Sequence, residues 1–197
     1  MTENTQRRSI GAKRNPASAE AILDAAENLL AERGLRGFTI EEVARRARAG
    51  KPTIYKWWSS KAALLLDVYQ RQKTIAFQDT GNLEDDIVAF ITAITIHWRD
   101  TPAGAVFRSV IAEAQSDEKA GQALRRFSDE RLSETSFLIL RGLERGEIKN
   151  GIFPKHAARW ISSYLWFRLL TGDLDVSQQN LRRDVSVLLL GLRKDEK

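Results

Sequence analysis

The side chains with the clearest chemistry stand close together in a short stretch, Gly-Lys-Pro-Thr-Ile-Tyr-Lys, at residues 50–56. Lys51 and Lys56 carry ammonium groups that can bind phosphate oxygens or the edge of a guanine. Thr53 can make a hydroxyl contact or touch a thymine methyl group. Which residue makes which contact stays open, but a segment with this chemistry is a candidate for binding nucleic acid.

The basic charge of the chain lies in the same part of the sequence. Residues 1–73 hold 14 Lys and Arg against 8 Asp and Glu, a net charge of +6, whereas residues 74–197 hold 17 against 18, a net charge of −1. A local positive field favours phosphate binding, because counterion release supplies most nonspecific affinity for DNA. A solvated basic surface is the alternative interpretation, and charge alone favours neither.

Enzyme and metal chemistry finds little support in this sequence. The absence of cysteine excludes disulfides, thiolate metal sites and cysteine nucleophiles. The two histidines, His97 and His156, do not stand at a metal-ligand spacing. An enzyme using His97 with Asp100 or Glu113 is a competing hypothesis, but no phosphate loop or nucleophile motif supports it. We expect no catalytic residue, no metal and no cofactor.

Capping signals predict a short helix before the lysine stretch. Thr39 and Glu42 form a Thr-x-x-Glu capping box, while Phe38 and Val43 occupy the two positions of a hydrophobic staple. This helix is expected to end near Ala47.

A second short helix follows after a tight turn. Gly50 is a permissible N-cap, and Pro52 is tolerated in the first turn because its missing N–H has no intrahelical partner there. Two short helices in this arrangement form a helix-turn-helix, here between about Phe38 and Trp58. The second helix of such a pair enters the DNA major groove, and Ile54 is expected to face the core instead. Trp57 and Trp58 are interpreted as packing residues.

The remaining pattern is also helical, with little of the alternation that strands require. We expect an all-α fold of about nine helices without a sheet. The other helices are predicted at about residues 16–33, 60–77, 83–99, 103–115, 117–144, 154–170 and 177–193. No apolar run reaches the roughly 18 residues of a membrane span, and no secretory signal is present. A cytoplasmic protein without a membrane partner is expected.

The last two predicted helices carry more apolar residues than a single buried face needs. Such a helical hairpin is either a monomer core or pairs with its own copy in a four-helix interface. For a homodimer, the expected interface residues are Trp160, Tyr164, Phe167, Leu181, Val185, Leu188, Leu189 and Leu192.

Residues Ala21–Tyr69, AILDAAENLLAERGLRGFTIEEVARRARAGKPTIYKWWSSKAALLLDVY, resemble the DNA-binding domain of TetR-type (tetracycline repressor-like) transcription regulators. The resemblance rests on the paired-alanine first helix, T-I-x-x-V-A, K-x-T-I-Y and S-K-x-x-L at the right mutual spacings. It covers about the first third of the chain, and the remainder carries no comparable motif.

The resemblance implies a three-helix DNA-binding domain with a connecting helix, residues 15–75, and a helical effector-binding and dimerisation domain, residues 76–197. The implied function is repression: a homodimer binds a palindromic DNA operator, and a small-molecule effector releases it. The alternative is a regulator without such an effector, controlled by a protein partner or constitutively bound. Trp98, Phe107 and Phe127 are candidates to line an effector pocket, although aromatic residues at helical spacing are more often ordinary core.

The expected DNA contacts combine both lines of reasoning. They are Thr39, Arg48, Gly50, Lys51, Pro52, Thr53, Tyr55, Lys56 and Lys61. The resemblance implies phosphate roles for Tyr55 and Lys61, and Thr39 presents a helix N-terminus that can bind a phosphate. Arg45, Arg46 and Arg48 have the alternative of a solvated face. Basic residues ahead of the first helix, Arg7, Arg8, Lys13 and Arg14, are either a minor-groove arm or a disordered tail.

Two residues depart from the family pattern. Arg48 stands where the turn usually has glycine, and a left-handed conformation there would cost on the order of 1 kcal/mol. Gly50 replaces a serine-type cap, a loss of roughly a few tenths of a kcal/mol. Neither departure removes the motif.

Overall fold

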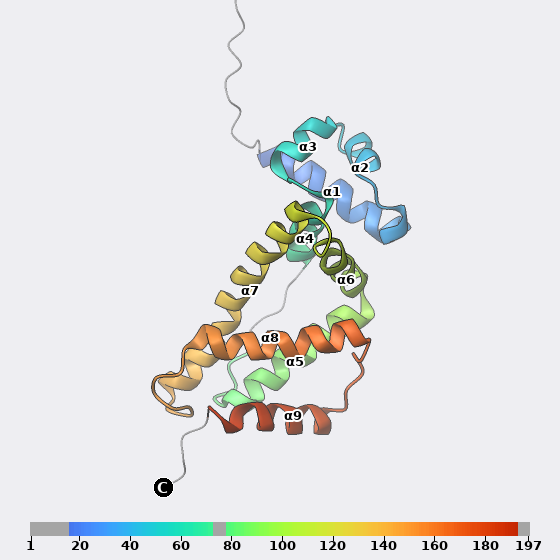
Figure 1. Ribbon diagram of the computed structural model, residues 1–197. Coiled ribbons are helices and arrows are strands. Elements are labelled where there is room, and N and C mark those ends of the chain that lie inside the picture. The colour runs from blue at the N-terminus through green and yellow to red at the C-terminus, as the bar shows by residue number, and fades with distance from the viewer. Residues whose placement is uncertain (1–15, 73–77, 193–197) are drawn as a thin grey trace, which may run out of the picture. The chain divides into compact units, whose positions relative to one another are not determined.

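The computed structural model describes residues 16–72 and 78–192 of the 197-residue chain (Figure 1). This part of the chain contains helices and an isolated β-bridge residue, Ile148, but no strand. The helices are α1 (Pro16–Arg33), the 3-10 helix η1 (Leu35–Gly37), α2 (Ile40–Arg46), α3 (Lys51–Trp57), α4 (Lys61–Gln72), α5 (Leu83–Asp100), α6 (Ala103–Glu113), α7 (Glu118–Glu144), α8 (Pro154–Thr171) and α9 (Gln178–Leu190). The predicted all-α fold is confirmed.

The helix bounds agree with the predictions to within a few residues, with one addition. Helix η1 was not predicted; it follows Gly34, whose φ of 62° suits the stop signal expected after α1. The predicted ends of the fourth helix near Phe77 and of the last helix near Arg193 lie outside the described residues, as does the basic segment with Arg7, Arg8, Lys13 and Arg14. None of the described helices is long and apolar enough to cross a membrane.

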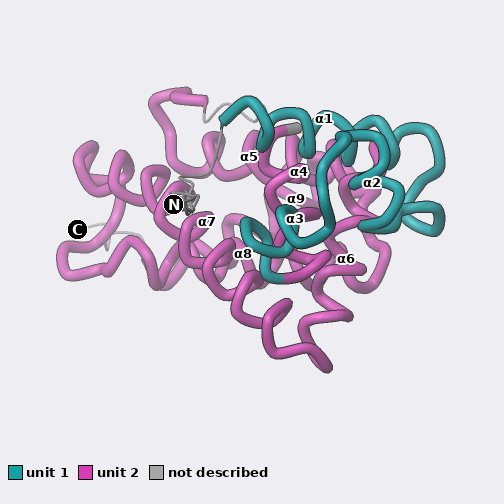
Figure 2. Tube along the Cα trace, turned by 90° about the horizontal axis from the view of Figure 1, so that it is seen from above, with its two compact units in different colours: residues 1–59 teal, residues 60–197 magenta. Residues whose placement is uncertain are grey.

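The chain divides into two compact units, residues 1–59 and residues 60–197 (Figure 2). Helix α4 belongs to the larger unit, because it packs on α6 and α7. The sequence-based domains, residues 15–75 and 76–197, instead keep this helix with the N-terminal domain, and that boundary stays a prediction.

The smaller unit is built on one apolar face of α1, where Ile22, Ala26 and Leu29 are fully buried. Helix α2 packs on α1, and α3 packs on α2. Phe38 and Val43 are buried as the hydrophobic staple requires. Their packing sets the angle at which the chain enters α2, and it thereby positions the turn and helix that follow.

The larger unit is organised around α7, which packs along α8 and also contacts α4, α5 and α6. Helix α5 lies between α8 and α9 (Figure 1). A close approach is built in at Gly104 of α6, where an added Cβ would lie 2.4 Å from the backbone oxygen of Trp98. Helices α4 to α8 therefore pack together within this unit.

A buried carboxylate ties the start of α5 to the end of α7. Asp86 is inaccessible to solvent, and its Oδ1 accepts hydrogen bonds of 2.8 Å from the backbone N–H and the hydroxyl of Thr80. Its Oδ2 lies 3.1 Å from Arg145 and 3.4 Å from Arg141. Burial alone raises the pKa of Asp86, but these hydrogen bonds and charges outweigh it and hold the pKa below its ordinary value.

Candidate DNA-binding surface and effector cavity

The turn between α2 and α3 has the geometry of a Schellman motif. The N–H of Ala49 donates to the carbonyl of Ala44 at 3.0 Å, and the N–H of Arg48 donates to that of Arg45 at 3.4 Å. Arg48 has a φ of 50°, the left-handed conformation for which glycine is suited. The backbone strain expected for a left-handed arginine at this position is therefore present.

Thr39 caps α2 as predicted, because its hydroxyl accepts a hydrogen bond of 3.2 Å from the N–H of Glu42. The reciprocal half of the capping box is replaced by ion pairs. The Glu42 carboxylate accepts hydrogen bonds from Arg45 at 2.8 Å and Arg46 at 3.0 Å, which lower its pKa to about 2. Arg46 also binds Glu32 at 2.7 Å. These pairs favour the solvated-face interpretation for Arg45, whereas the Arg46 side chain is largely buried between Glu32 and Glu42.

Helix α3 turns one face inward and leaves the other open. Ile54 is fully buried, as predicted, and Thr53 is half-buried. The exposed residues of this helix are Lys51, Pro52, Tyr55 and Lys56. Gly50 caps the helix without a side-chain hydrogen bond and with a φ of −72°, so this glycine meets no backbone constraint. The open face therefore carries four of the nine residues expected to contact DNA.

The lysines of this region differ in what they already bind. The Lys51 ammonium lies 3.0 Å from the Glu41 carboxylate, and both side chains are exposed. Such a surface pair contributes only about 0–1 kcal/mol, so a phosphate can replace the carboxylate. Lys56 makes no ion pair within the described part of the chain. Lys61 is the first residue of α4, in the larger unit.

The two tryptophans at the end of α3, Trp57 and Trp58, are packing residues, as interpreted from the sequence. Their rings meet edge to face with centroids 6.0 Å apart. Trp58 is buried, and Trp57 is half-buried. Neither ring therefore offers a free face comparable to that of exposed Tyr55.

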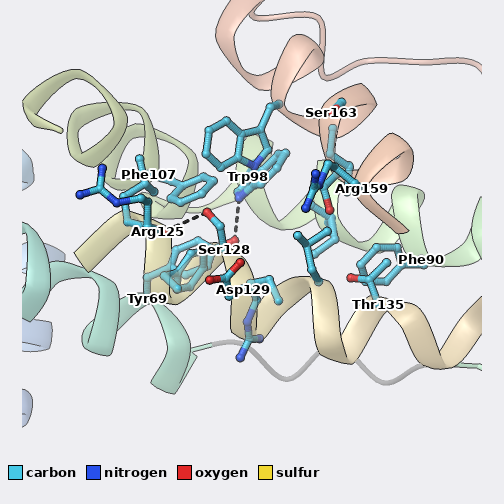
Figure 3. A pocket seen from close by; sticks show the side chains of 18 residues that line it. Tyr69, Phe90, Trp98, Phe107, Arg125, Ser128, Asp129, Thr135, Arg159 and Ser163 are labelled. Atoms are coloured by element: carbon cyan, nitrogen blue, oxygen red, sulfur yellow. Dashed lines mark hydrogen bonds between the residues drawn. The ribbon is translucent and has the colours of Figure 1, made fainter. Parts of the chain in front are cut away.

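The larger unit contains a cavity of about 600 Å³ among α4, α5, α6, α7 and α8 (Figure 3). Its lining residues are Tyr69, Phe90, Ile94, Trp98, Phe107, Leu124, Arg125, Phe127, Ser128, Asp129, Arg131, Leu132, Thr135, Arg159, Ser162, Ser163, Leu165 and Trp166. All three aromatic residues proposed from the sequence lie in this lining. The lining as a whole comes from five separate helices, and its convergence could not be derived from spacing along any one of them.

Aromatic rings cluster around Phe107 at one end of the cavity. The ring of Phe107 stacks on Tyr69 at 5.3 Å and on Trp98 at 5.9 Å between centroids. Phe127 lies 5.3 Å from it and Trp166 5.6 Å. Contacts of this kind stabilise the cluster beyond the burial of its area.

Tyr69 brings α4 into this cluster. The indole N–H of Trp98 donates a hydrogen bond of 2.9 Å to the Tyr69 hydroxyl (Figure 3). Burial raises the pKa of Tyr69 to about 12, so its hydroxyl stays protonated near neutral pH. Tyr69 therefore brings the helix that directly follows the smaller unit in the chain into the wall of the cavity.

Both halves of the chain match family models. Residues 22–68 match the model described as "Bacterial regulatory proteins, tetR family", and residues 77–188 match "Tetracyclin repressor-like, C-terminal domain". The HTH-type transcriptional regulator YdeS of Bacillus subtilis is 34% identical over 167 residues, which cover 83% of this chain and 84% of YdeS. The chain belongs to the TetR family. It is a helix-turn-helix transcriptional regulator.

Solved structures agree with this assignment. The TetR family transcription regulator SCO0332 superposes with a TM-score of 0.76 and 31% identity, over 88% of this chain and 97% of SCO0332. The regulator FadR of Bacillus subtilis, solved in complex with stearoyl-CoA, shares the fold with a TM-score of 0.56 and 19% identity, over 87% of this chain and 98% of FadR. The fold of this TetR-family regulator therefore occurs in a protein that holds a ligand.

The residues expected at a dimer interface of this regulator fall into two groups. Trp160 and Phe167 of α8 are 59% and 64% exposed, and Tyr164 and Leu188 are half-buried. The other four, Leu181, Val185, Leu189 and Leu192, are buried within the chain.

An interface role for these four residues stays a prediction, and their burial within one chain leaves them little surface to offer a partner. Leu181, Val185 and Leu189 belong to α9, which packs on α5 of the same chain, and Leu192 follows that helix. The apolar residues that α8 and α9 leave exposed also include Leu170, Val187 and Leu190. Sequence periodicity identified the apolar stripe of α9, but it did not show that α5 covers it.

The competing enzyme hypothesis gains nothing from the placement of its residues. The carboxylate of Asp100 is held by Arg99 at 2.7 Å, and His97 packs its ring against Tyr69 with centroids 6.1 Å apart. No group of three or more potential metal ligands occurs among residues 16–72 and 78–192.

Proposed function

We propose that this TetR-family regulator is a homodimeric repressor that binds a palindromic operator through α3 and is released by a small molecule in the cavity of the larger unit. The observation that carries the proposal is Tyr69, a residue of α4 that forms part of the cavity wall. Its target would place the protein with the chromosome, in the cytoplasm.

Operator binding would use the open face of α3. Lys51, Tyr55 and Lys56 are exposed there, with Thr53 at its edge. In a helix-turn-helix such residues meet base edges and phosphates in the major groove. Thr39 orients the N–H groups at the start of α2, and these can bind a phosphate. Arg48 and Lys61 remain candidates for further phosphate contacts.

Dimer formation would cover the apolar residues that α8 and α9 leave exposed. Trp160, Phe167 and Leu170 on α8 and Val187 and Leu190 on α9 are all more than half exposed. Large contiguous apolar surfaces on a folded chain are typical of protein interfaces. A two-fold symmetric contact of these helices would bring two copies of α3 to one operator.

Release by a ligand is supported by the cavity itself. Its volume of about 600 Å³ lies in the range of small-molecule sites. A ligand that binds better to one position of Tyr69 would favour the corresponding position of α4, and modest movement of α4 changes the separation of the two DNA-binding units. Successive major grooves require a separation of about 34 Å. The alternative without an effector predicts no well-formed cavity.

Selection of bound DNA from a random pool, using the purified full chain, tests the operator proposal. We expect a palindrome whose half-sites are spaced by about one helical turn. The Lys56→Ala variant should weaken binding to all sequences and reduce the salt dependence by about one ion. Lys155 is an exposed residue of α8, and Lys155→Ala removes the same charge. This control variant should change neither the operator affinity nor its salt dependence. Recovery of no preferred sequence would refute the proposal.

A further inference from the structure

The cavity changes in polarity from its floor to its mouth. Its buried lining residues are apolar apart from Thr135 and the hydroxyl of Tyr69. Its exposed lining residues are all polar: Arg125, Asp129, Arg159 and Ser163. An occupant must therefore be amphipathic, with an apolar body on the floor and a polar group at the mouth.

The mouth is cationic. Three arginines, Arg125, Arg131 and Arg159, line the cavity with a single acid, Asp129, which gives a net charge of +2. Arg125 and Arg159 make no hydrogen bond or ion pair within the described part of the chain. They come from α7 and α8, and in Figure 3 Arg125 lies beside Phe107 while Arg159 lies beside Ser163.

Arg131 adds an unsatisfied donor to the same wall. One of its terminal nitrogens binds Glu134 at 2.5 Å, and its guanidinium lies 5.5 Å from the ring centroid of Phe127. Its Nε is buried and has no hydrogen-bond partner. Glu134 does not line the cavity. When its charge is included, the net charge at the mouth is still +1. A buried donor without an acceptor is unfavourable, so an anionic acceptor from a ligand would relieve it.

We infer that the effector is a flat aromatic molecule that carries one carboxylate or comparable anionic group. The rings would pack on the cluster of Phe107, Phe127 and Trp166, and the anion would lie at the mouth, where Arg125 and Arg159 both contribute positive charge. A positively charged effector is disfavoured by the same arginines. This inference rests on the proposed effector role of the cavity and specifies its chemistry.

Three probes with the same ring system test the charge requirement: pyrenecarboxylate, pyrenemethanol and pyrenemethylammonium. Isothermal titration calorimetry on the full chain should show the carboxylate binding about tenfold or more tightly than the alcohol, as one charge-assisted contact would give. The ammonium should bind most weakly. Equal affinities for the three probes, or no binding of any of them, would overturn the inference.

Charge-removing variants locate the anion. Arg159→Gln and Arg125→Gln should each reduce the preference for carboxylate over alcohol while leaving the affinity for the alcohol within about twofold. Arg126→Gln is the matched control, since Arg126 is exposed on the same helix as Arg125 and does not line the cavity. A carboxylate preference that survives the double Arg125→Gln, Arg159→Gln variant would overturn the assignment.

Operator binding measured by fluorescence anisotropy on the same samples separates this inference from the proposed function. Binding to the selected operator without any carboxylate preference overturns the ligand class and leaves operator recognition standing. A carboxylate preference that the arginine variants abolish supports the ligand class even when the probe leaves the operator bound, and that result counts against ligand-induced release instead.

Discussion

Replacing Arg48 by glycine should stabilise the smaller unit of this regulator. Arg48 occupies the C′ position of the Schellman motif that ends α2, with a φ of 50°. A residue with a Cβ loses about 1–2 kcal/mol in this conformation, and glycine does not. Glycine in turn loses about 0.5–1 kcal/mol more backbone entropy on folding. The net gain for Arg48→Gly relative to Arg48→Ala is therefore about 1 kcal/mol.

The comparison with Arg48→Ala isolates the backbone contribution, because both variants remove the same charged side chain. The local free energy of opening is measured by hydrogen exchange of peptides from residues 40–57, which cover α2, the turn and α3. Equilibrium urea denaturation of the full chain supplies the global value.

The same pair of variants tests the proposed DNA contact of Arg48. Both should weaken operator binding to the same extent and reduce its salt dependence by about one ion when the guanidinium contacts a phosphate. Equal stabilities of the glycine and alanine variants would refute the strain argument. Normal operator affinity in both would remove Arg48 from the DNA-binding surface.

Three further perturbations follow from the packing. Asp86→Asn removes the buried carboxylate that Arg145 and Arg141 share, while Asp79 and Glu147 still pair with these arginines, and it should destabilise the chain by about 1–3 kcal/mol in urea denaturation. Because the pKa of Asp86 is lowered in the folded state, its contribution is present above the unfolded pKa and is lost as the pH falls through the lower folded value. Gly104→Ala places a Cβ 2.4 Å from the Trp98 carbonyl oxygen and should lower thermal stability by about 1–3 kcal/mol. Phe167→Glu puts a charge on the exposed face of α8 and should shift sedimentation toward the monomer.

Each of these variants has a matched control in the same chain. Asp85→Asn breaks an exposed pair with Arg182, 2.6 Å long, and should change stability by about 0–1 kcal/mol. Gly191→Ala meets no atom within 4 Å at a φ of −76° and should be neutral or stabilising. Ile96→Glu, at an exposed position on α5, should leave the oligomer unchanged. A variant that behaves like its control would contradict the corresponding argument.

The sequence by itself determined the helix-turn-helix, because the interactions that form it are local. The hydroxyl of Thr39 caps a helix within three residues, and Ile54 turns inward by the helical period. The strain at Arg48 also follows from a neighbouring backbone motif, so it could be predicted as a condition of that turn. Even here one interaction differs from the capping box. The Glu42 carboxylate accepts hydrogen bonds from Arg45 and Arg46 instead of from the backbone N–H of Thr39.

Only the tertiary structure decided the composition of the cavity and the free face of the C-terminal helices. Tyr69, Arg125 and Arg159 stand on three helices far apart in the sequence, and they line one cavity because α4 and α8 both pack on α7. The apolar stripe of α9 was visible as a period, but a period does not distinguish burial against α5 from burial against a second chain. Local spacing selects which side of a helix is apolar, and the packing of distant segments selects what covers it.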